Sequence, residues 1–186
     1  LPLGKKTKAF LTRARFYEAR LYKIYEVSGS PAESDDTVRA GVAHAALKSS
    51  EENLIKNAGE WLPPFLTGTA LGESAVYDAL YYYLDGAIVD KNAPASIVLP
   101  NGKSCALVYE AAADGAVRPT AEIIVQRMFG CFETPRVMGV PVLFKLLSPA
   151  RRPLQITDDL AGFWKGAWLE ICKEMKGRYP KHNWDY

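Results

Sequence analysis

The sequence contains few of the residues from which metal and disulfide centres are built. Among 186 residues there are two histidines, His44 and His182, and three cysteines, Cys105, Cys131 and Cys172. The cysteines are odd in number and widely spaced, with no C-x-x-C pair, which argues against a disulfide framework or a zinc site. We therefore expect reduced thiols in a cytoplasmic protein, each packed as a small apolar group, and no bound metal.

Motifs that bind nucleotides or perform hydrolysis are also missing. The sequence has no G-x-x-x-x-G-K-[ST] phosphate-binding loop, no glycine-rich dinucleotide fingerprint, and neither G-x-S-x-G nor H-E-x-x-H. Two histidines and scattered carboxylates do not form a catalytic pattern, so a free-standing enzyme has little support. We predict that this segment carries no catalytic residue and binds no cofactor.

Long apolar runs are absent as well. No stretch approaches the length needed to cross a bilayer, and the basic start at Leu1–Lys8 is not followed by the apolar part of a secretory signal. We therefore expect no membrane insertion. Because the chain begins with Leu1 rather than Met, we interpret it as a piece of a longer protein, with a processed N-terminus as the alternative.

What is present is an ordinary globular composition whose pattern changes along the chain. Apolar residues make up 48% and charged residues 24%, and the net charge of +2 does not by itself mark a nucleic-acid binder. Helical spacing comes first, and strands with two further helices follow, an order that is typical of the α+β class. We predict a helical subdomain over residues 1–90 and a small mixed sheet with two packed helices over residues 91–186.

The first half is expected to form three helices. Apolar residues recur there at three- and four-residue steps, and helix-ending residues separate the runs. The apolar connector Trp61–Leu66 contains two prolines that prevent a regular helix. The predicted helices cover residues 5–27, 35–57 and 75–85, the last with Ser74 as N-cap.

The second half is expected to begin with strands and turns. Asn101-Gly102 lies between two apolar runs and predicts a hairpin, and Asp114-Gly115 predicts a second turn. Residues 119–129 fit a strand or a helix, and Pro119 near the start with Gly130 as a stop favours the helix. The predicted strands cover residues 97–99, 105–109, 140–147 and 154–156.

The last helix is predicted to begin after Thr157 or Asp158 and to end at Gly177. One face combines lysines with Gly162 and Gly166, which suggests that another group approaches the helix closely. That group is either a neighbouring element of the same domain or a phosphate backbone. The other face is wide and apolar, and we expect it to be core rather than a platform for base stacking. Its residues are Leu160, Phe163, Trp164, Ala167, Trp168, Ile171 and Met175.

Cations near the C-terminus are the candidate nucleic-acid contacts. Arg151 and Arg152 lie between two prolines, where a rigid backbone suits bidentate contact with phosphate. The alternative is a structural ion pair with one of the carboxylates Asp158, Asp159 and Glu174. The tail alternates cations with aromatics, a pattern that combines phosphate attraction with stacking, although a self-packed or disordered tail is left open. The predicted contacts are Arg151, Arg152, Lys165, Lys173, Lys176, Arg178, Tyr179, Lys181 and Trp184.

Several short segments then occur in a recognisable order. The segments Glu60–Gly68, Gln126–Gly130, Glu133–Pro135 and Leu146–Trp184 resemble the C-terminal region of HrpB-type bacterial ATP-dependent helicases of the DEAH-box class. The first fifty-odd residues match weakly. The resemblance implies two RecA-like motor domains that bind ATP and magnesium and that unwind or remodel nucleic acid, RNA rather than DNA. It implies that this chain follows the motor as an accessory part, without the P-loop or the DEAH box, and it carries over no catalytic residue.

Two hypotheses about function follow. In the first, the segment is a non-catalytic accessory domain that helps a helicase to bind nucleic acid, or that positions the motor domains of the same protein. In the second, it is a docking domain without nucleic-acid contact, in which Trp61–Leu66 and the last helix bind the motor or another protein. Convergence of the basic N-terminal helix with the cations between Arg151 and Lys181 would favour the first, and a contiguous exposed apolar patch would favour the second.

Overall fold

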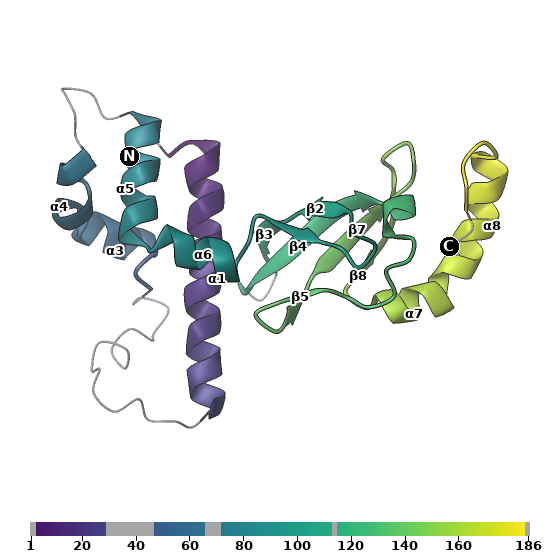
Figure 1. The fold of residues 1–186 in the computed structure, drawn as a ribbon, viewed down its shortest axis with the longest axis horizontal. Coiled ribbons are helices and arrows are strands. Elements are labelled where there is room, and N and C mark those ends of the chain that lie inside the picture. Colours follow the sequence, from purple (N-terminus) through teal and green to yellow (C-terminus); the bar gives the residue numbers. More distant parts are fainter. Residues whose placement is uncertain (1–2, 29–46, 66–71, 113–114, 185–186) are drawn as a thin grey trace. The chain divides into compact units, whose positions relative to one another are not determined.

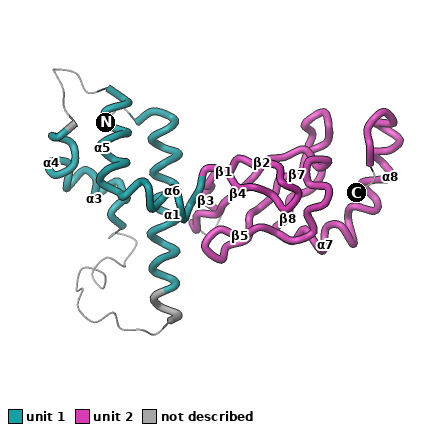
Figure 2. Tube along the Cα trace, viewed as in Figure 1, with its two compact units in different colours: residues 1–94 teal, residues 95–186 magenta. Residues whose placement is uncertain are grey.

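The chain divides into two compact units, Leu1–Pro94 and Ala95–Tyr186, in a computed structural model (Figure 2). The structure describes residues 3–28, 47–65, 72–112 and 115–184, and each unit is considered by itself. Unit 1 is helical and unit 2 combines sheets with helices, so the predicted α+β class is confirmed. No helix in the described ranges is both long and apolar enough to span a bilayer.

Unit 1 is built around the long helix α1 (Lys5–Ser28), which packs against α5 (Glu73–Tyr83) and α6 (Gly86–Asn92) (Figure 1). Three short elements precede α5 in the chain: α3 (Glu51–Lys56), α4 (Ala58–Trp61) and the 3-10 helix η2 (Pro63–Phe65). The helix α1 confirms the helix predicted over residues 5–27. The longer helices fill the core with apolar side chains from their facing sides, namely Phe10, Leu11, Ala14, Phe16, Val76, Ala79, Leu80 and Val89.

Polar side chains of α1 hold the segment that leads into α3. The Glu18 carboxylate accepts hydrogen bonds from the Ser49 backbone N–H (3.1 Å) and hydroxyl (2.6 Å), and Arg15 Nε donates to the Ser49 carbonyl at 3.1 Å. Burial makes the charged carboxylate less favourable and raises the pKa of Glu18, although the hydrogen bonds from Ser49 act in the opposite direction. Ser49 is thus fixed to α1 at both its backbone and its side chain.

The helix predicted over residues 75–85 is confirmed as α5 with other boundaries: Gly72 rather than Ser74 is its N-cap, and it ends at Tyr83. Of the segment predicted as a helix over residues 35–57, the structure describes residues 47–57: residues 47–50 form a turn, and α3 begins at Glu51, where the Ser50 hydroxyl accepts from the Asn53 N–H as a cap. Residues 29–46, with His44, lie outside the described residues. The element α6 was not predicted. It begins after Asp85, whose backbone is left-handed (φ 51°) and ends the run of α5.

Unit 2 contains a four-stranded sheet in the order β3-β4-β7-β8 (Figure 1). Its strands are β3 (Val108–Ala111), β4 (Val117–Ile124), β7 (Leu143–Leu147) and β8 (Pro153–Thr157). The central pair β4 and β7 is parallel, and the two outer pairs are antiparallel. Two small antiparallel pairs accompany this sheet: β1 (Ser96–Val98) with β2 (Ser104–Ala106), and β5 (Arg136–Val137) with β6 (Val140–Pro141).

Strands occur in unit 2 at the predicted places, but residues 105–109 are divided between β2 and β3, and residues 140–147 between β6 and β7. The Asn101-Gly102 turn joins β1 and β2, with Gly102 at φ 79°, a backbone conformation that favours glycine. The helix predicted over residues 119–129 is wrong, because β4 extends to Ile124 and only a short 3-10 helix, η3 (Val125–Met128), follows. Pro119 is tolerated there because the pairing with β7 begins one residue later, at Thr120. Asp114 lies outside the described residues.

The last helix is divided in two, α7 (Leu160–Lys165) and α8 (Ala167–Arg178), by Gly166. Asp159, rather than Thr157 or Asp158, is its N-cap and accepts a hydrogen bond from the Gly162 N–H at 2.9 Å. Gly177 does not end α8, which continues to Arg178. The expectation that the aromatic face is core is confirmed for Leu160, Phe163, Trp164, Trp168 and Met175, while Ala167 is exposed and Ile171 half-buried.

All three cysteines are free thiols, as expected. Cys105 and Cys131 are buried, and Cys172 is half-buried. Burial raises the pKa of the Cys105 thiol, since the thiolate would lose its contact with water. A buried thiol with a raised pKa is a packing group rather than a nucleophile.

Candidate nucleic-acid interface

The two predicted arginines lie in a short, well-fixed turn between β7 and β8. The buried Ser148 closes this turn: its N–H donates to the Arg152 carbonyl, and its hydroxyl accepts from the Arg152 N–H at 3.1 Å. The Arg151 N–H donates to the Ser148 carbonyl at 2.9 Å. The backbone of Arg151 is left-handed, with φ 57°, a conformation that residues other than glycine rarely adopt. These hydrogen bonds with Ser148 fix the backbone of both arginines.

Both arginine side chains are exposed and available for an external partner. Neither forms an ion pair with any residue in the described part of the chain. The acidic residues named as alternative partners are engaged elsewhere: Asp158 pairs with Arg118, Glu174 pairs with Arg178, and Asp159 caps α7. Within the described residues, a structural ion pair therefore does not account for Arg151 and Arg152.

The sheet topology brings further cations to the same end of unit 2. In the parallel pair, Ile124 lies beside Leu147, so β4 and β7 leave the sheet at one end. There β7 continues into the arginine turn and β4 continues into η3. The Gln126 side chain of η3 donates to the Asn183 carbonyl at 3.1 Å, which fixes the C-terminal tail at this end. Lys181, two residues earlier in the tail, is exposed there.

Two cations at this end were missed in the sequence. Asn101, at the tip of the β1–β2 hairpin, donates to the Arg127 carbonyl (2.8 Å) and to the Phe129 carbonyl (2.9 Å). The exposed side chains of Lys103 and Arg127 therefore lie near the end of the sheet that carries the arginine turn. The only signals in the sequence were that Lys103 follows the Asn-Gly turn and that Arg127 lies within the Gln126–Gly130 segment, both of which were already singled out. We call the set Lys103, Arg127, Arg151, Arg152 and Lys181 the cationic end of unit 2.

Elsewhere in unit 2, several cations are paired with carboxylates. Lys145 Nζ lies 2.7 Å from a Glu110 oxygen, and the Arg178 guanidinium lies 2.8 Å from Glu174 one helical turn earlier. For the five members of the cationic end, no such pair occurs among the described residues. None of these five cations is therefore held in a direct ion pair by a carboxylate of the described residues.

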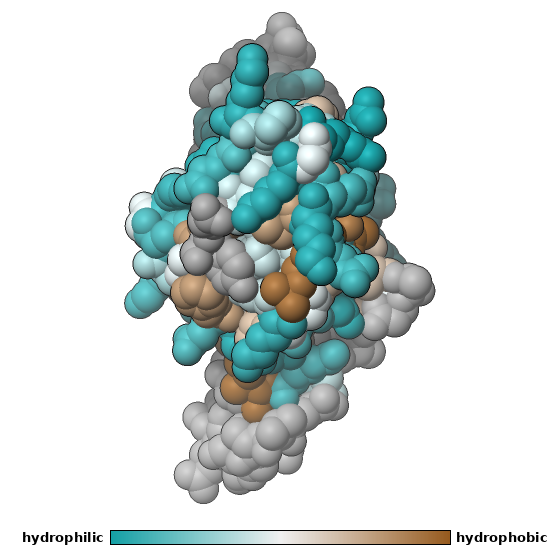
Figure 3. Space-filling model, turned by 90° about the vertical axis from the view of Figure 1, so that its right-hand side faces the viewer, coloured by the Kyte–Doolittle hydropathy of each residue, from teal (hydrophilic) through white to brown (hydrophobic). Residues whose placement is uncertain are grey.

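The remaining predicted contacts are distributed over the last two helices and the tail. Lys165, Lys173 and Lys176 are exposed on α7 and α8, and Arg178 is exposed in its pair with Glu174. Tyr179 is half-buried, with its ring 6.0 Å from that of His182. Figure 3, which views the molecule from the side on which Figure 1 draws α8, shows mainly hydrophilic side chains with hydrophobic ones in separate small areas. No broad apolar face is visible in that view.

Trp184 does not fit its predicted role as a stacking group. Only 3% of this residue is exposed, and its indole N–H donates to the Tyr179 carbonyl at 3.0 Å. Its ring lies 6.1 Å from that of Trp168 in α8, so the described part of the tail packs on the last helix. Burial removes both faces of this indole from contact with a base, and Trp184 is a core residue.

Local helix geometry explains both glycines of the last helix. A side chain at position 162 would collide with the Asp159 carboxylate, which must lie there to cap α7. At Gly166 the backbone breaks the helix, and an added Cβ would lie 3.2 Å from the Gly162 carbonyl oxygen. The close approach expected at these glycines is thus made by the helix itself, and neither glycine is evidence for a phosphate.

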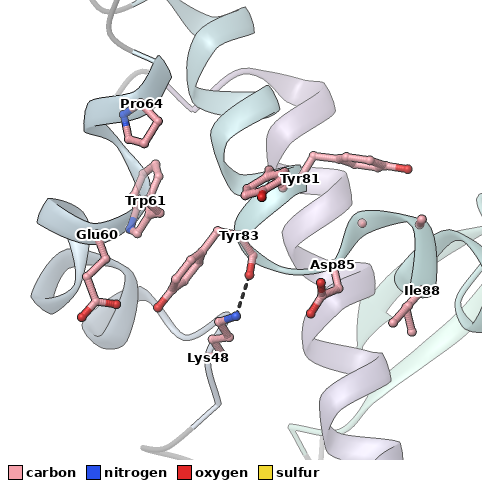
Figure 4. Close-up of a pocket in the computed structure, with 11 residues that line it drawn as sticks. Lys48, Glu60, Trp61, Pro64, Tyr81, Tyr83, Asp85 and Ile88 are labelled. Atoms are coloured by element: carbon pink, nitrogen blue, oxygen red, sulfur yellow. Dashed lines mark hydrogen bonds between the residues drawn. The ribbon is translucent and has the colours of Figure 1, made fainter.

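The segment expected to dock on a partner is partly buried in unit 1. Trp61 is 2% exposed, and its indole donates to the Leu54 carbonyl at 3.0 Å. It borders a hollow in which Lys48 donates to the Tyr83 carbonyl at 2.6 Å and lies 4.2 Å above the Tyr83 ring (Figure 4). Leu66 lies outside the described residues. Trp61 thus contributes to the fold of unit 1 rather than to an open apolar surface.

Comparison with known proteins gives a consistent result. The family of ATP-dependent helicase C-terminal regions defined on HrpB matches residues 61–185. The "ATP-dependent RNA helicase HrpB" of Escherichia coli is 41% identical over 143 residues, which cover 72% of this chain and 17% of that protein. The crystal structure of the E. coli DExH-box NTPase HrpB superposes with a TM-score of 0.65 at 33% identity, over 93% of this chain and 20% of that one.

A second crystal structure, of the Escherichia coli DEAH/RHA helicase HrpB, gives a TM-score of 0.59 at 30% identity. It covers 97% of this chain and 21% of the solved chain. The present chain thus spans about a fifth of the length of the proteins that it matches.

Proposed function

The chain belongs to the family of HrpB-type ATP-dependent helicase C-terminal regions, and we propose that it is the non-catalytic accessory part of such a helicase. In this proposal, ATP and magnesium bind to the motor domains of the same protein, which carry the hydrolysis. The present segment contacts the nucleic-acid strand and so helps to hold it on the enzyme. Arg151 and Arg152 are the central contacts.

The observation that carries this proposal is the cationic end of unit 2. Exposed cations without carboxylate partners attract the phosphate backbone and displace its condensed counterions, which favours binding at low salt. Arginine guanidinium groups donate in pairs to phosphate oxygens, and the fixed β7–β8 turn limits the entropy lost on binding. Contacts of this kind hold a strand without reading its sequence.

We propose single-stranded RNA as the ligand. The E. coli relative is named an RNA helicase, and this name supports RNA over DNA. The exposed Phe132, five residues after Arg127, and the half-buried Tyr179 are the aromatic groups that could stack on an unpaired base.

The test is the affinity of the 186-residue chain for a labelled single-stranded RNA, measured at several salt concentrations. Arg151→Gln with Arg152→Gln should weaken binding and lower the slope of log K against log salt by about 1.4, at about 0.7 for each lost contact on a single strand. Lys145→Gln is the matched control, because this lysine is in the same unit but is paired with Glu110.

A single-stranded DNA of the same sequence distinguishes the two nucleic acids. Equal affinity for both would contradict the assignment to RNA while leaving the phosphate contacts intact. If the double arginine variant binds as the parent does, the proposed contact is wrong, and a docking function without nucleic acid is the reading to pursue.

A further inference from the structure

We propose that Lys103 and Arg127 form a second phosphate-contact site, which extends the path of a single strand beyond the Arg151–Arg152 turn. The ligand is a phosphodiester group of the same single-stranded nucleic acid, so this inference rests on the proposed function. Asn101 is the positioning residue, because it joins the two elements that carry the cations. None of these three residues was predicted as a contact from the sequence.

The Asn101 side chain is fully used in holding the hairpin tip against η3. Its amide nitrogen donates to the carbonyls of Arg127 and Phe129, at 2.8 and 2.9 Å. Its amide oxygen accepts from the Lys103 backbone N–H at 3.1 Å. One side chain therefore fixes the backbones of both cations, which are 24 residues apart in the sequence.

Arg127 is oriented but retains most of its donors. One guanidinium nitrogen donates to the Ser104 carbonyl at 3.1 Å, which aims the group across the β1–β2 hairpin. A guanidinium carries five N–H donors, so the exposed group can still bind phosphate through two of them. Lys103 is exposed beside it and follows Gly102, whose left-handed backbone makes the tight tip possible.

The new pair and the arginine turn belong to one end of unit 2. Residue Ile124, which leads into η3, lies beside Leu147, which leads into the turn. A strand that contacts Arg151 and Arg152 can therefore continue over η3 to Arg127 and the hairpin tip. Two fixed pairs of cations suit successive phosphates of one backbone better than a single pair does.

Lys103→Gln with Arg127→Gln tests the site in the 186-residue chain, with single-stranded RNA as probe. The expected result is weaker binding and a salt slope lower by about 1.4, equal to the change expected for the arginine turn. Arg136→Gln is the matched control. It is likewise exposed and donates to a backbone carbonyl, that of Gly139, but it lies in the β5–β6 hairpin, which precedes β7 at the opposite end of the sheet.

The outcomes separate this inference from the proposed function. If the arginine-turn variant loses affinity and the Lys103/Arg127 variant does not, the second site is wrong and the proposed function stands. If neither variant changes the salt slope, the proposed function itself fails, and the second site fails with it.

Asn101→Ala tests the positioning role separately. It should weaken binding in the parent chain but have no further effect on affinity in the Lys103→Gln, Arg127→Gln background, because the cations that it positions are absent. The free energy of unfolding, measured in both backgrounds, shows whether the variant still folds. An equal loss of affinity in the two backgrounds would mean that Asn101 has only a structural role.

Discussion

Arg151 combines the phosphate contact that we propose with an unfavourable backbone conformation. A residue with a Cβ in the left-handed region costs about 1 to 2 kcal/mol. Glycine avoids this cost, but its greater freedom in the unfolded chain offsets part of the gain. We therefore expect Arg151→Gly to raise the free energy of unfolding by up to about 1 kcal/mol, measured by chemical denaturation. The same variant should bind RNA more weakly, because one phosphate contact is lost.

This opposition between stability and binding is typical of a functional position. Arg151→Ala is the control, since it removes the cation but keeps the Cβ. It should weaken binding to the same extent without the gain in stability. If Arg151→Gly binds RNA as tightly as the parent, the arginine is present at this strained position for another reason.

Glu18 links the stability of unit 1 to pH. Burial raises its pKa in the folded state, so the folded chain binds this proton more tightly than the unfolded chain, whose value is near 4.5. The resulting stability is fully present below the unfolded pKa and is lost as the pH rises through the folded pKa. Glu18→Gln should therefore improve the free energy of unfolding, relative to the parent, more at pH 7 than at pH 4. Urea denaturation gives the free energy of unfolding of both proteins at each pH. If the two curves of this free energy against pH are parallel, the assignment to Glu18 is wrong.

At the scale of residues, the arginine turn could be predicted and its neighbours could not. Two prolines around Arg151 and Arg152 mark a rigid exposed turn in the sequence itself. Trp184 was misjudged because its burial depends on contacts with Trp168 and Tyr179. Lys103 and Arg127 come together only through Asn101, and no local pattern records a contact over that separation.

Capping at the start of α7 gives a prediction for an element. The Asp159 carboxylate accepts from the Gly162 N–H, whereas Asp158 makes only a long pair, 3.9 Å, with Arg118. Asp159→Ala should lower the free energy of unfolding by about 1 kcal/mol, the usual cost of losing an N-cap. Asp158→Ala should change it by less than about 0.5 kcal/mol, as exposed pairs contribute little. Equal losses in thermal or chemical denaturation would show that the cap is not the relevant contact.

Element types were predictable where the pattern allowed one interpretation. The spacing of α1 and the Asn-Gly hairpin each have a single good solution, and both predictions are confirmed. The segment after Pro119 fits both periods, and what makes it a strand is pairing on both sides, with β3 and with β7. That pairing depends on segments before and after it in the chain, so local propensity could not decide the matter.

For the whole molecule, order along the chain was predictable and topology was not. Helices before strands correctly indicate an α+β chain, because each element type leaves its own period in the sequence. The parallel pairing of β4 with β7 leaves no such signal, since the segment between them could return to either end of the sheet. Yet this pairing is what assembles the cationic end, because it makes η3 and the arginine turn leave the sheet together.

The net charge of only +2 makes a final distinction possible between global and local electrostatics. Arg151→Gln with Arg152→Gln, and Lys56→Gln with Lys91→Gln, each lower the formal net charge from +2 to zero. The two lysines are exposed on short helices of unit 1, whereas the cationic end belongs to unit 2. If local contacts hold the RNA, the arginine pair should lower affinity and the salt slope while the lysine pair changes both only slightly. Equal losses in the two double variants, measured side by side at several salt concentrations, would instead mean that the charge of the whole molecule attracts the strand and that the fixed turn has no special part in holding it.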